Sequence, residues 1–260
     1  MTGQIHVASE GHLAWVTLSH AGKFNAMSRA MWRALRELFE DIQRGADGRN
    51  PDVRCVVIRG EAGHFCAGGD IAEYPAFRFD VQSLRAFHEE EVWGGLQAML
   101  DCDVPIVAQI EGNCMGAGLE IASCADIRLA AASARFGAPI ARLGFPMAPR
   151  EAALVAQQAG SLTARQMLLE AAVFSAAEMR ERGFLSAVPA DEDLPAEALA
   201  CARRIAALAP QAARMNKQTL REIQPATYSL LLERDPYAYA DGAEHREGIT
   251  AFLEKRKPAF

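Results

Sequence analysis

The stretch Glu111-Gly112-Asn113-Cys114-Met115-Gly116-Ala117-Gly118-Leu119-Glu120 decides how this chain folds. It follows the apolar run 105–110 and precedes the apolar, alanine-rich run 121–125. This order indicates a buried strand, then a glycine-rich turn, then a helix. Free backbone N–H groups at a helix start can hold an oxyanion, and the helix dipole favours negative charge there. Because Glu120 lies one helical turn after Ala117, the stretch predicts an oxyanion donor beside a carboxylate that moves protons.

A second glycine-bearing turn, Phe65-Cys66-Ala67-Gly68-Gly69-Asp70, follows the apolar run 53–58. In a parallel sheet both turns lie at the carboxyl edge, where ligands bind. The N–H groups of Gly69 and Ala117 could therefore converge on one carbonyl oxygen and stabilise an enolate or a tetrahedral oxyanion. The alternative is that these glycines only permit tight turns. The residues alone leave both interpretations open.

The rest of the N-terminal half alternates strands with helices. A hairpin is predicted around Glu10-Gly11, and Ser28 is expected to cap a helix with apolar residues at helical spacing. The expected strands are 4–8, 12–18, 53–58, 105–110 and 126–131, with a polar loop over 45–51 and a long helix over 81–101. Such β–loop–helix units favour an α/β fold with a mainly parallel sheet. From Pro149 onward only helical patterns are found, and the segments are 150–159, 163–170, 175–182, 195–208, 210–222 and 243–256.

Composition excludes several classes of protein. The chain has 260 residues, of which 50% are hydrophobic and 23% charged, as in ordinary soluble globular proteins. No apolar run is long enough to span a membrane, and the polar start lacks the apolar segment of a signal peptide. We therefore expect a cytoplasmic protein with no membrane partner. The net charge of −6 argues against nucleic acid as a partner.

Cysteine and histidine spacing gives no sign of a metal site. The six cysteines form no Cys-x-x-Cys pair and are interpreted as structural thiols of a reducing compartment. The six histidines include no His-x-x-x-His pair on a helix, so no metal is expected.

Several motifs, in order along nearly the whole chain, resemble the enoyl-CoA hydratase/isomerase (crotonase) family. The motifs are Lys23-Phe24-Asn25-Ala26-Met27, Phe65-Cys66-Ala67-Gly68-Gly69-Asp70-Ile71, the stretch 112–120, Ser133-Ala134-Arg135-Phe136-Gly137-Ala138-Pro139, Arg142-Leu143-Gly144, and 246–258. The resemblance implies a crotonase-like (ClpP/crotonase) β/α spiral core of near-perpendicular sheets over residues 1–195. It also implies an all-helical C-terminal region over 196–260, which belongs to the same unit and builds a homotrimer or a hexamer (a dimer of trimers).

The resemblance also assigns roles to single residues. Gly69 and Ala117 would supply the oxyanion-hole N–H groups for an acyl-CoA thioester, with Glu120 as the catalytic acid/base. Coenzyme A would be part of the substrate, so no separate cofactor and no metal are expected. The residues expected to bind substrate or CoA are Lys23, Ala67, Asp70, Ile71, Ala72, Phe252 and Lys255. Of these, Phe252 and Lys255 match positions that reach the CoA of a neighbouring subunit, although 255–257 could equally be a solvated helix end.

Three departures from the family pattern bear on the reaction. Hydratases of the family use two glutamates; Glu120 matches the first, but Ile140 stands where the second should follow Pro139. The turn that helps to position water is altered over 145–151. Ala117 replaces the usual glycine, which keeps the N–H and narrows the pocket slightly.

A single acid/base group leaves several activities open. Enoyl-CoA hydratase is the simplest description; an isomerase, a thioester hydrolase, a methylmalonyl-CoA-type decarboxylase and a catalytically decayed CoA-thioester binding protein are the alternatives. Similar decarboxylases carry a tyrosine near Met147, and that tyrosine is absent here. Glu90 and Glu91 could reach the acyl pocket, but solvated positions are the favoured interpretation, and His64 and His88 are discounted in the same way.

Overall fold

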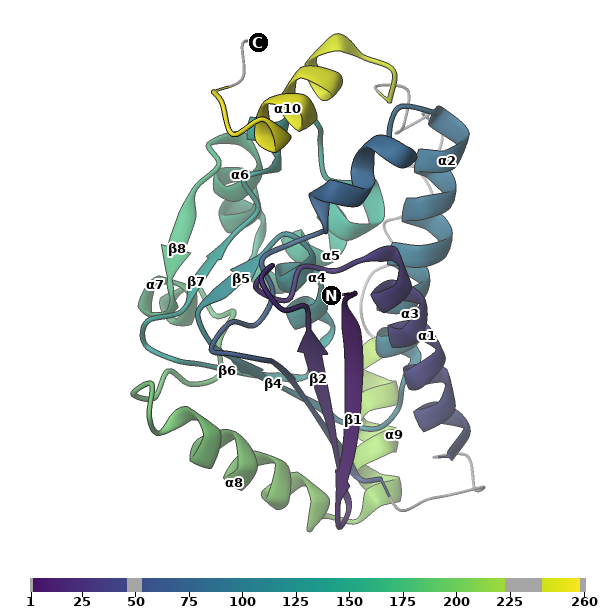
Figure 1. Ribbon diagram of the computed structural model, residues 1–260. Coiled ribbons are helices and arrows are strands. Elements are labelled where there is room, and N and C mark those ends of the chain that lie inside the picture. Colours follow the sequence, from purple (N-terminus) through teal and green to yellow (C-terminus); the bar gives the residue numbers. More distant parts are fainter. Residues whose placement is uncertain (1, 46–52, 223–239, 258–260) are drawn as a thin grey trace.

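The computed structural model describes residues 2–45, 53–222 and 240–257 (Figure 1). Within these residues, one sheet has the strand order β1-β2-β3-β4-β6 and a second has the order β5-β7-β8. In the first sheet β1 and β2 are antiparallel, and the remaining neighbours are parallel. This confirms the predicted α/β fold with a mainly parallel sheet. The strands are β1 (Gln4–Glu10), β2 (Leu13–Ser19), β3 (Cys55–Gly60), β4 (Ile106–Ile110), β5 (Asn113–Met115), β6 (Ile127–Ala130), β7 (Arg135–Gly137) and β8 (Val173–Ser175).

The first helix, α1 (Arg29–Arg44), begins where the sequence predicts it. The Ser28 hydroxyl accepts a hydrogen bond from the Met31 N–H at 3.3 Å and so caps the helix. The side chains of Met31, Leu35 and Phe39 are fully buried and recur at helical spacing. They hold α1 against the large sheet as part of the main core.

The helix predicted over 81–101 is continuous but changes its winding. It comprises α2 (Val81–Ala86), the π-helical turn η3 (Phe87–Val92) and α3 (Trp93–Asp101). It is preceded by the 3₁₀ helix η2 (Ile71–Ala76), which Asp70 caps by accepting from the Ala72 N–H. Single π turns inside α-helices occur frequently at functional sites, and this turn carries His88.

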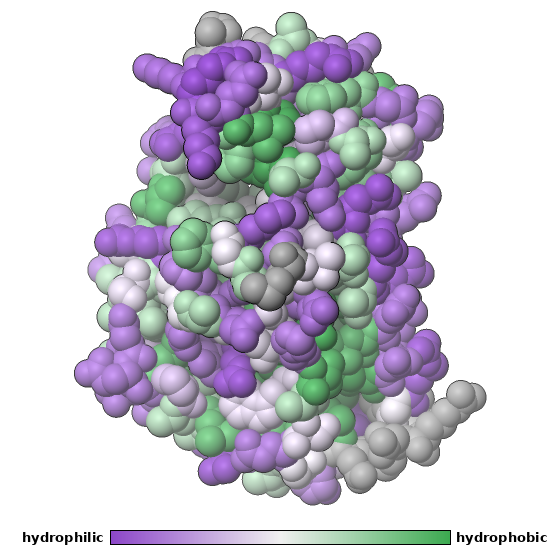
Figure 2. Space-filling model, in the orientation of Figure 1, coloured by the Kyte–Doolittle hydropathy of each residue, from purple (hydrophilic) through white to green (hydrophobic). Residues whose placement is uncertain are grey.

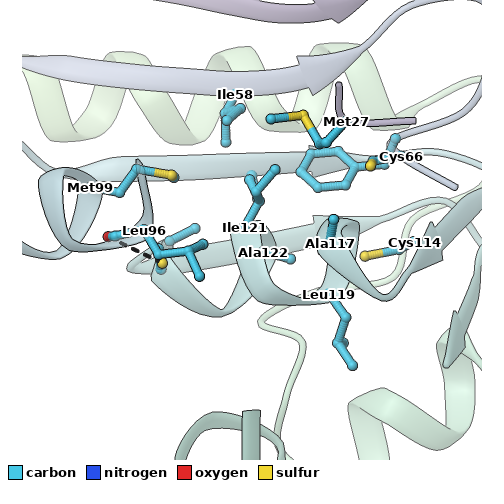
Figure 3. Close-up of a cluster of buried hydrophobic side chains, with 14 of the residues drawn as sticks. Met27, Ile58, Cys66, Leu96, Met99, Cys114, Ala117, Leu119, Ile121 and Ala122 are labelled. Carbon is cyan, nitrogen blue, oxygen red and sulfur yellow. Dashed lines mark hydrogen bonds between the residues drawn. The ribbon is translucent and has the colours of Figure 1, made fainter. Parts of the chain in front are cut away.

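The opening stretch folds as predicted, with one addition. After β4 the chain forms the short strand β5 and then α4 (Ala117–Cys124), all of whose residues are buried. Figure 3 shows Ala117, Leu119, Ile121 and Ala122 of α4 among the buried apolar side chains of the core. A helix this deeply buried gives its N-terminal N–H groups a low-dielectric setting, where their charge interactions are strong.

The expectation of helices alone after Pro149 is wrong at one place, because residues 173–175 form strand β8. They pair antiparallel with β7, and a three-residue strand is too short to show an alternating pattern. The other elements are α5 (Pro149–Ala159), α6 (Ser161–Leu169), α7 (Ala176–Glu181), α8 (Leu194–Ala206), α9 (Pro210–Glu222) and α10 (Ala243–Leu253), with the 3₁₀ helix η4 (Ile140–Leu143) before them.

Helix α8 covers one face of the large sheet, as the lower part of Figure 1 shows. Its Cys201 and Ala202 share a buried cluster with Val57 and Val107 of the sheet. The expected division between residues 195 and 196 lies after the second residue of this helix.

Helix α10 contacts η2 and η4 at the other end of the molecule. The approach is close: a Cβ atom added at Gly248 would overlap the backbone of Leu143. Glycine at 248 is what lets the helix backbone reach η4.

The surface and the cysteines agree with the composition. The face in Figure 2 is mostly hydrophilic, with apolar side chains in small separate groups. All six cysteines are buried free thiols, and burial raises the pKa of Cys66 to about 12. In the part of the chain that the structure describes, no helix is long and apolar enough to cross a membrane. The polar loop expected over 45–51 lies outside the described residues except for Gly45.

Candidate active site

The two glycine-bearing turns lie against each other. The Cys66 N–H donates to the Asn113 carbonyl at 2.8 Å, and the Met115 N–H donates to the Cys66 carbonyl at 2.9 Å. Directly beyond these bonds, a Cβ added at Gly116 would lie 3.7 Å from the Gly68 Cα. The predicted proximity of the two turns is thus a feature of the fold.

Gly69 and Ala117 follow these contacts and line one cavity. Ala117 is the first residue of α4, so its N–H has no acceptor within the helix. Gly116 reaches this helix start with φ +46° and ψ −110°, a conformation that needs glycine. Among the described residues, no hydrogen bond uses the N–H of Gly69 or of Ala117 as donor. Two N–H groups at one cavity can bind an oxyanion.

Glu120 lines the same cavity and is only 9% exposed. Burial raises its pKa well above the ordinary value, and the charge of Glu151 raises it further. The Arg78 guanidinium acts in the opposite direction. The site therefore favours the protonated form of the Glu120 carboxyl, which can donate a proton to a group bound in the cavity.

A buried polar chain, Glu151–His88–Arg78–His245, adjoins Glu120. His88 Nδ1 lies 3.0 Å from Glu151 Oε1, and His88 Nε2 lies 3.3 Å from Arg78 Nη1. Arg78 Nε donates to His245 Nε2 at 3.2 Å, and His245 Nδ1 lies 3.0 Å from the Ala240 carbonyl. Since an arginine can only donate, both imidazoles accept through Nε2 and carry their proton on Nδ1. Arg78 and His88 line the cavity.

The cavity has a volume of about 450 Å³, a common size for a small-molecule site. Ile140 lines it, so no carboxylate stands at that position. Arg142 and Arg256 are further cationic lining residues. Its apolar lining residues include Trp32, Ile71, Phe87, Val92, Ile140, Leu143, Phe145 and Met147.

The residues expected to bind CoA divide into three groups. Ala67 and Ile71 line the cavity. Lys23 Nζ lies 2.6 Å from the Asp70 carboxylate, which caps η2, so this pair organises the loop beside the cavity. Ala72 is exposed and does not line the cavity.

The two C-terminal residues differ in their relation to the cavity. Phe252 of α10 lines the cavity of its own chain. Lys255 is exposed and is not a lining residue, whereas its neighbour Arg256 is. Whether Phe252 and Lys255 also reach a neighbouring subunit stays a prediction.

The discounted glutamates and His64 lie outside the cavity. Glu91 binds Arg29 through both carboxylate oxygens and also Arg33, and Glu90 is exposed. His64 packs edge-on against Phe24. His88 is different, because it does line the cavity.

Sequence reasoning missed Arg78, Glu151 and His245. Arg78 stands between two phenylalanines, which is a weak sign of burial, and it is 1% exposed. Glu151 lies in the first turn of α5, where an exposed acidic residue ordinarily interacts favourably with the helix dipole. The Glu151 residue is nevertheless buried, with only 2% of its surface exposed. His245 has no local signal at all.

Comparisons with known proteins indicate the family of the chain. Residues 8–260 match the family model described as enoyl-CoA hydratase/isomerase. The chain is 30% identical to the 2,3-dehydroadipyl-CoA hydratase of Escherichia coli, over 99% of this chain and 98% of that protein. It is 35% identical to an enoyl-CoA hydratase/carnithine racemase from Magnetospirillum magneticum, with a TM-score of 0.80 and coverage of 98% and 94%. A methylmalonyl-CoA decarboxylase in complex with 2-nitronate-propionyl-CoA is 26% identical, with a TM-score of 0.85 and coverage of 98% and 97%.

Proposed function

The chain belongs to the enoyl-CoA hydratase/isomerase family and has its crotonase fold, and on this premise we propose that it acts as an enoyl-CoA hydratase. The observation that carries the proposal is the presence of Gly69, Ala117 and Glu120 along one cavity. Two hydrogen-bond donors and one protonated carboxyl are what the chemistry of a thioester enolate requires.

In the proposed reaction the thioester oxygen accepts hydrogen bonds from the N–H groups of Gly69 and Ala117. Water adds through its oxygen to the β-carbon of the enoyl group, and negative charge moves to the thioester oxygen. Glu120 gives its proton to the α-carbon, and the carboxylate that results takes up the proton released by water, leaving a 3-hydroxyacyl-CoA and a protonated Glu120. An oxyanion hole of this kind is worth about 3–4 kcal/mol of barrier per donor.

A second candidate is the decarboxylation of a malonyl-CoA-type thioester, and the combination of Ile140 with a protonated Glu120 favours it. Adding water needs a base as well as an acid, and because isoleucine is neither, Glu120 would have to serve as both. Loss of carbon dioxide leaves the enolate directly, so only the oxyanion donors and the proton of Glu120 are needed. The similarity to a methylmalonyl-CoA decarboxylase supports including this reaction in the tests.

For the CoA moiety we propose that Lys23, Ala67, Asp70, Ile71, Ala72, Phe252 and Lys255 line its path. For the assembly we propose a homotrimer or a hexamer. The exposed apolar side chains of Met215 and Leu220 on α9 support contacts with another copy. Light scattering on the purified protein would measure the mass of the assembly.

The test uses crotonyl-CoA, a 3-enoyl-CoA and methylmalonyl-CoA in heavy-oxygen water, followed by mass spectrometry. Labelled 3-hydroxyacyl-CoA supports the hydratase, and loss of carbon dioxide supports the decarboxylase. Binding of acyl-CoA without any product would instead indicate a decayed binding protein. The Glu120→Gln variant should lose the activity, whereas Glu170→Gln, an exposed change on the surface, should keep it.

A further inference from the structure

Arg78 is a cation built into the wall of the acyl cavity. Its side chain lines the cavity although the residue is only 1% exposed. The guanidinium carbon lies 4.5 Å from the centre of the Tyr74 ring and 4.0 Å from that of Phe145, and both rings also line the cavity. Charged residues are almost never buried this fully unless they are paired, and the partners of Arg78 include the imidazoles of His88 and His245.

The surroundings of Arg78 fix its orientation. The two neutral imidazoles of His88 and His245 accept from Nη1 and Nε, so two N–H groups are committed to known directions. The Glu151 carboxylate is bound to the other ring nitrogen of His88 and so orients that imidazole. Rings and imidazoles hold the guanidinium plane in place, which is the kind of preorganisation that a binding site for a planar anion requires.

Arg78 is also connected to the proposed thioester site through Tyr74. A Cβ added at Gly69 would overlap the Tyr74 hydroxyl, and the same Tyr74 ring stacks on Arg78. Arg78 and the residue proposed to hold the thioester oxygen thus contact the same Tyr74 side chain in the wall of one cavity.

We propose that Arg78 binds a carboxylate on the acyl group, so that the substrate is the CoA thioester of a dicarboxylic acid. This inference rests on the proposed function, because it takes the cavity to hold the acyl group. Glu120, Arg142 and Arg256 also line the cavity, but most of the other lining residues are apolar, and in such a setting a buried cation favours an acyl group with a negative end over a plain alkyl chain. Arginine and carboxylate match in shape as well as in charge.

The carboxylate could stand at either of two places on the acyl group. On the α-carbon, as in malonyl-CoA, it would be the group lost as carbon dioxide. At the far end of a longer chain, as in glutaryl-CoA, it would be retained. The chemistry recognised by Arg78 is the same, and the experiment separates the two.

The experiment measures binding by titration calorimetry, so it does not depend on turnover. Each dicarboxylic thioester is compared with its neutral monoamide: glutaryl-CoA with its amide, and malonyl-CoA with its amide, with butyryl-CoA as the uncharged reference. For malonyl-CoA, mass spectrometry records any acetyl-CoA that forms. We expect one carboxylate to bind roughly 10- to 100-fold more tightly than its amide, which is the range for a hydrogen bond between charged groups.

Variants then connect the preference to Arg78. Arg78→Met should remove the ratio between carboxylate and amide, and Arg78→Lys should keep part of it because the charge remains. Arg165→Gln, an exposed arginine on α6, should leave the ratio unchanged. If Arg78 only stabilises the fold, its variants change the two affinities equally and the ratio stays.

The outcomes separate the position of the carboxylate, the role of Arg78 and the proposed function. A preference within the glutaryl pair supports a distal carboxylate, and a preference within the malonyl pair supports a carboxylate on the α-carbon. If butyryl-CoA binds while the wild-type protein shows no preference in either pair, the inference about Arg78 is wrong and the proposed function stands. If no thioester binds, the proposed function itself fails, and the inference fails with it. If Arg78→Met does not fold, Arg78→Lys carries the test, because a preference that it leaves unchanged would belong to another cation of the cavity such as Arg142 or Arg256.

Discussion

His88 Nδ1 lies 3.0 Å from Glu151 Oε1, although the two residues are 63 positions apart. The imidazole comes from the π turn η3 and the carboxylate from the first turn of α5. Because the opposite nitrogen of His88 accepts from Arg78, Nδ1 carries the proton and donates it to Glu151. Glu151 therefore does two things: it fixes the imidazole, and its charge raises the pKa of Glu120.

The first prediction concerns Glu151→Gln. The amide oxygen still accepts from His88, but the negative charge is gone, so the pKa of Glu120 falls. An activity that needs protonated Glu120 declines as pH rises through that pKa. The basic limb of the rate profile should therefore move to lower pH in the variant. The measurement is kcat/KM against pH for both proteins, with Glu170→Gln as the control; identical profiles would contradict the proposed coupling.

The second prediction is that Glu120→Gln lowers the activity and raises the stability of the fold. Loss of the proton donor should lower kcat by about 10²- to 10⁴-fold. The raised pKa of Glu120 means that folding opposes its ionisation, so stability is lost as pH rises above the ordinary value of 4.5 toward the folded-state value. Glutamine does not ionise, and the variant should be more stable by about 0.5–2 kcal/mol near neutral pH.

The stability gain has its own check. Urea unfolding of the two proteins should give different midpoints near neutral pH, and the difference should shrink below pH 4.5, where the unfolded-state carboxyl is protonated as well. A variant that is less stable than the wild type at neutral pH would show that Glu120 stabilises the fold in its charged form.

The third prediction concerns Gly69→Ala. The new Cβ overlaps the Tyr74 hydroxyl, and because the Tyr74 ring is packed against three phenylalanines, we expect the loop to shift and carry the N–H away from the oxyanion. Loss of one oxyanion donor lowers kcat by about 10²- to 10³-fold. Adding Tyr74→Phe removes the overlapping oxygen. The nearest ring carbon then lies 3.1 Å from the new Cβ, a tight contact that a small shift can relieve. The double variant should recover part of kcat in a steady-state assay; no recovery would mean that the displaced N–H is not the cause.

The sequence was informative wherever a signal is local. The cap at Ser28 and the turn before Ala117 each depend on residues within one short segment, and both are confirmed. Strands β5, β7 and β8 were missed because three-residue strands exist through their pairing, not through a pattern of their own.

The polar chain was missed for a related reason. Arg78 and His245 are 167 positions apart, and no spacing rule connects residues that meet only when the turn after η2 packs against α10. Glu151 had a sufficient local explanation as a helix-start residue, which concealed its burial. The absence of a carboxylate at Ile140 was readable directly, whereas the polar groups that do line the cavity were not.

The last prediction follows from His245, which attaches α10 to the cavity wall. Burial and the nearby Arg78 charge lower its pKa to about 4 from the ordinary 6.5, and Arg246 and His88 act in the same direction. Between these two values the unfolded state binds a proton that the folded state does not, so stability is present above pH 6.5 and is lost as pH falls toward 4. The full loss is up to about 3 kcal/mol.

The matched variant is His245→Gln, whose amide oxygen can accept from Arg78 Nε but does not titrate. The wild-type free energy of unfolding should fall between pH 6.5 and 4 by more than that of the variant, while His6→Gln, an exposed change on β1, should behave like the wild type. Protonated His245 would face the Arg78 cation, so the amides of α10 should also exchange with solvent faster at the acidic end of this range. Parallel pH dependences in the wild type and His245→Gln, together with unchanged exchange in α10, would show that this histidine does not hold the helix in place.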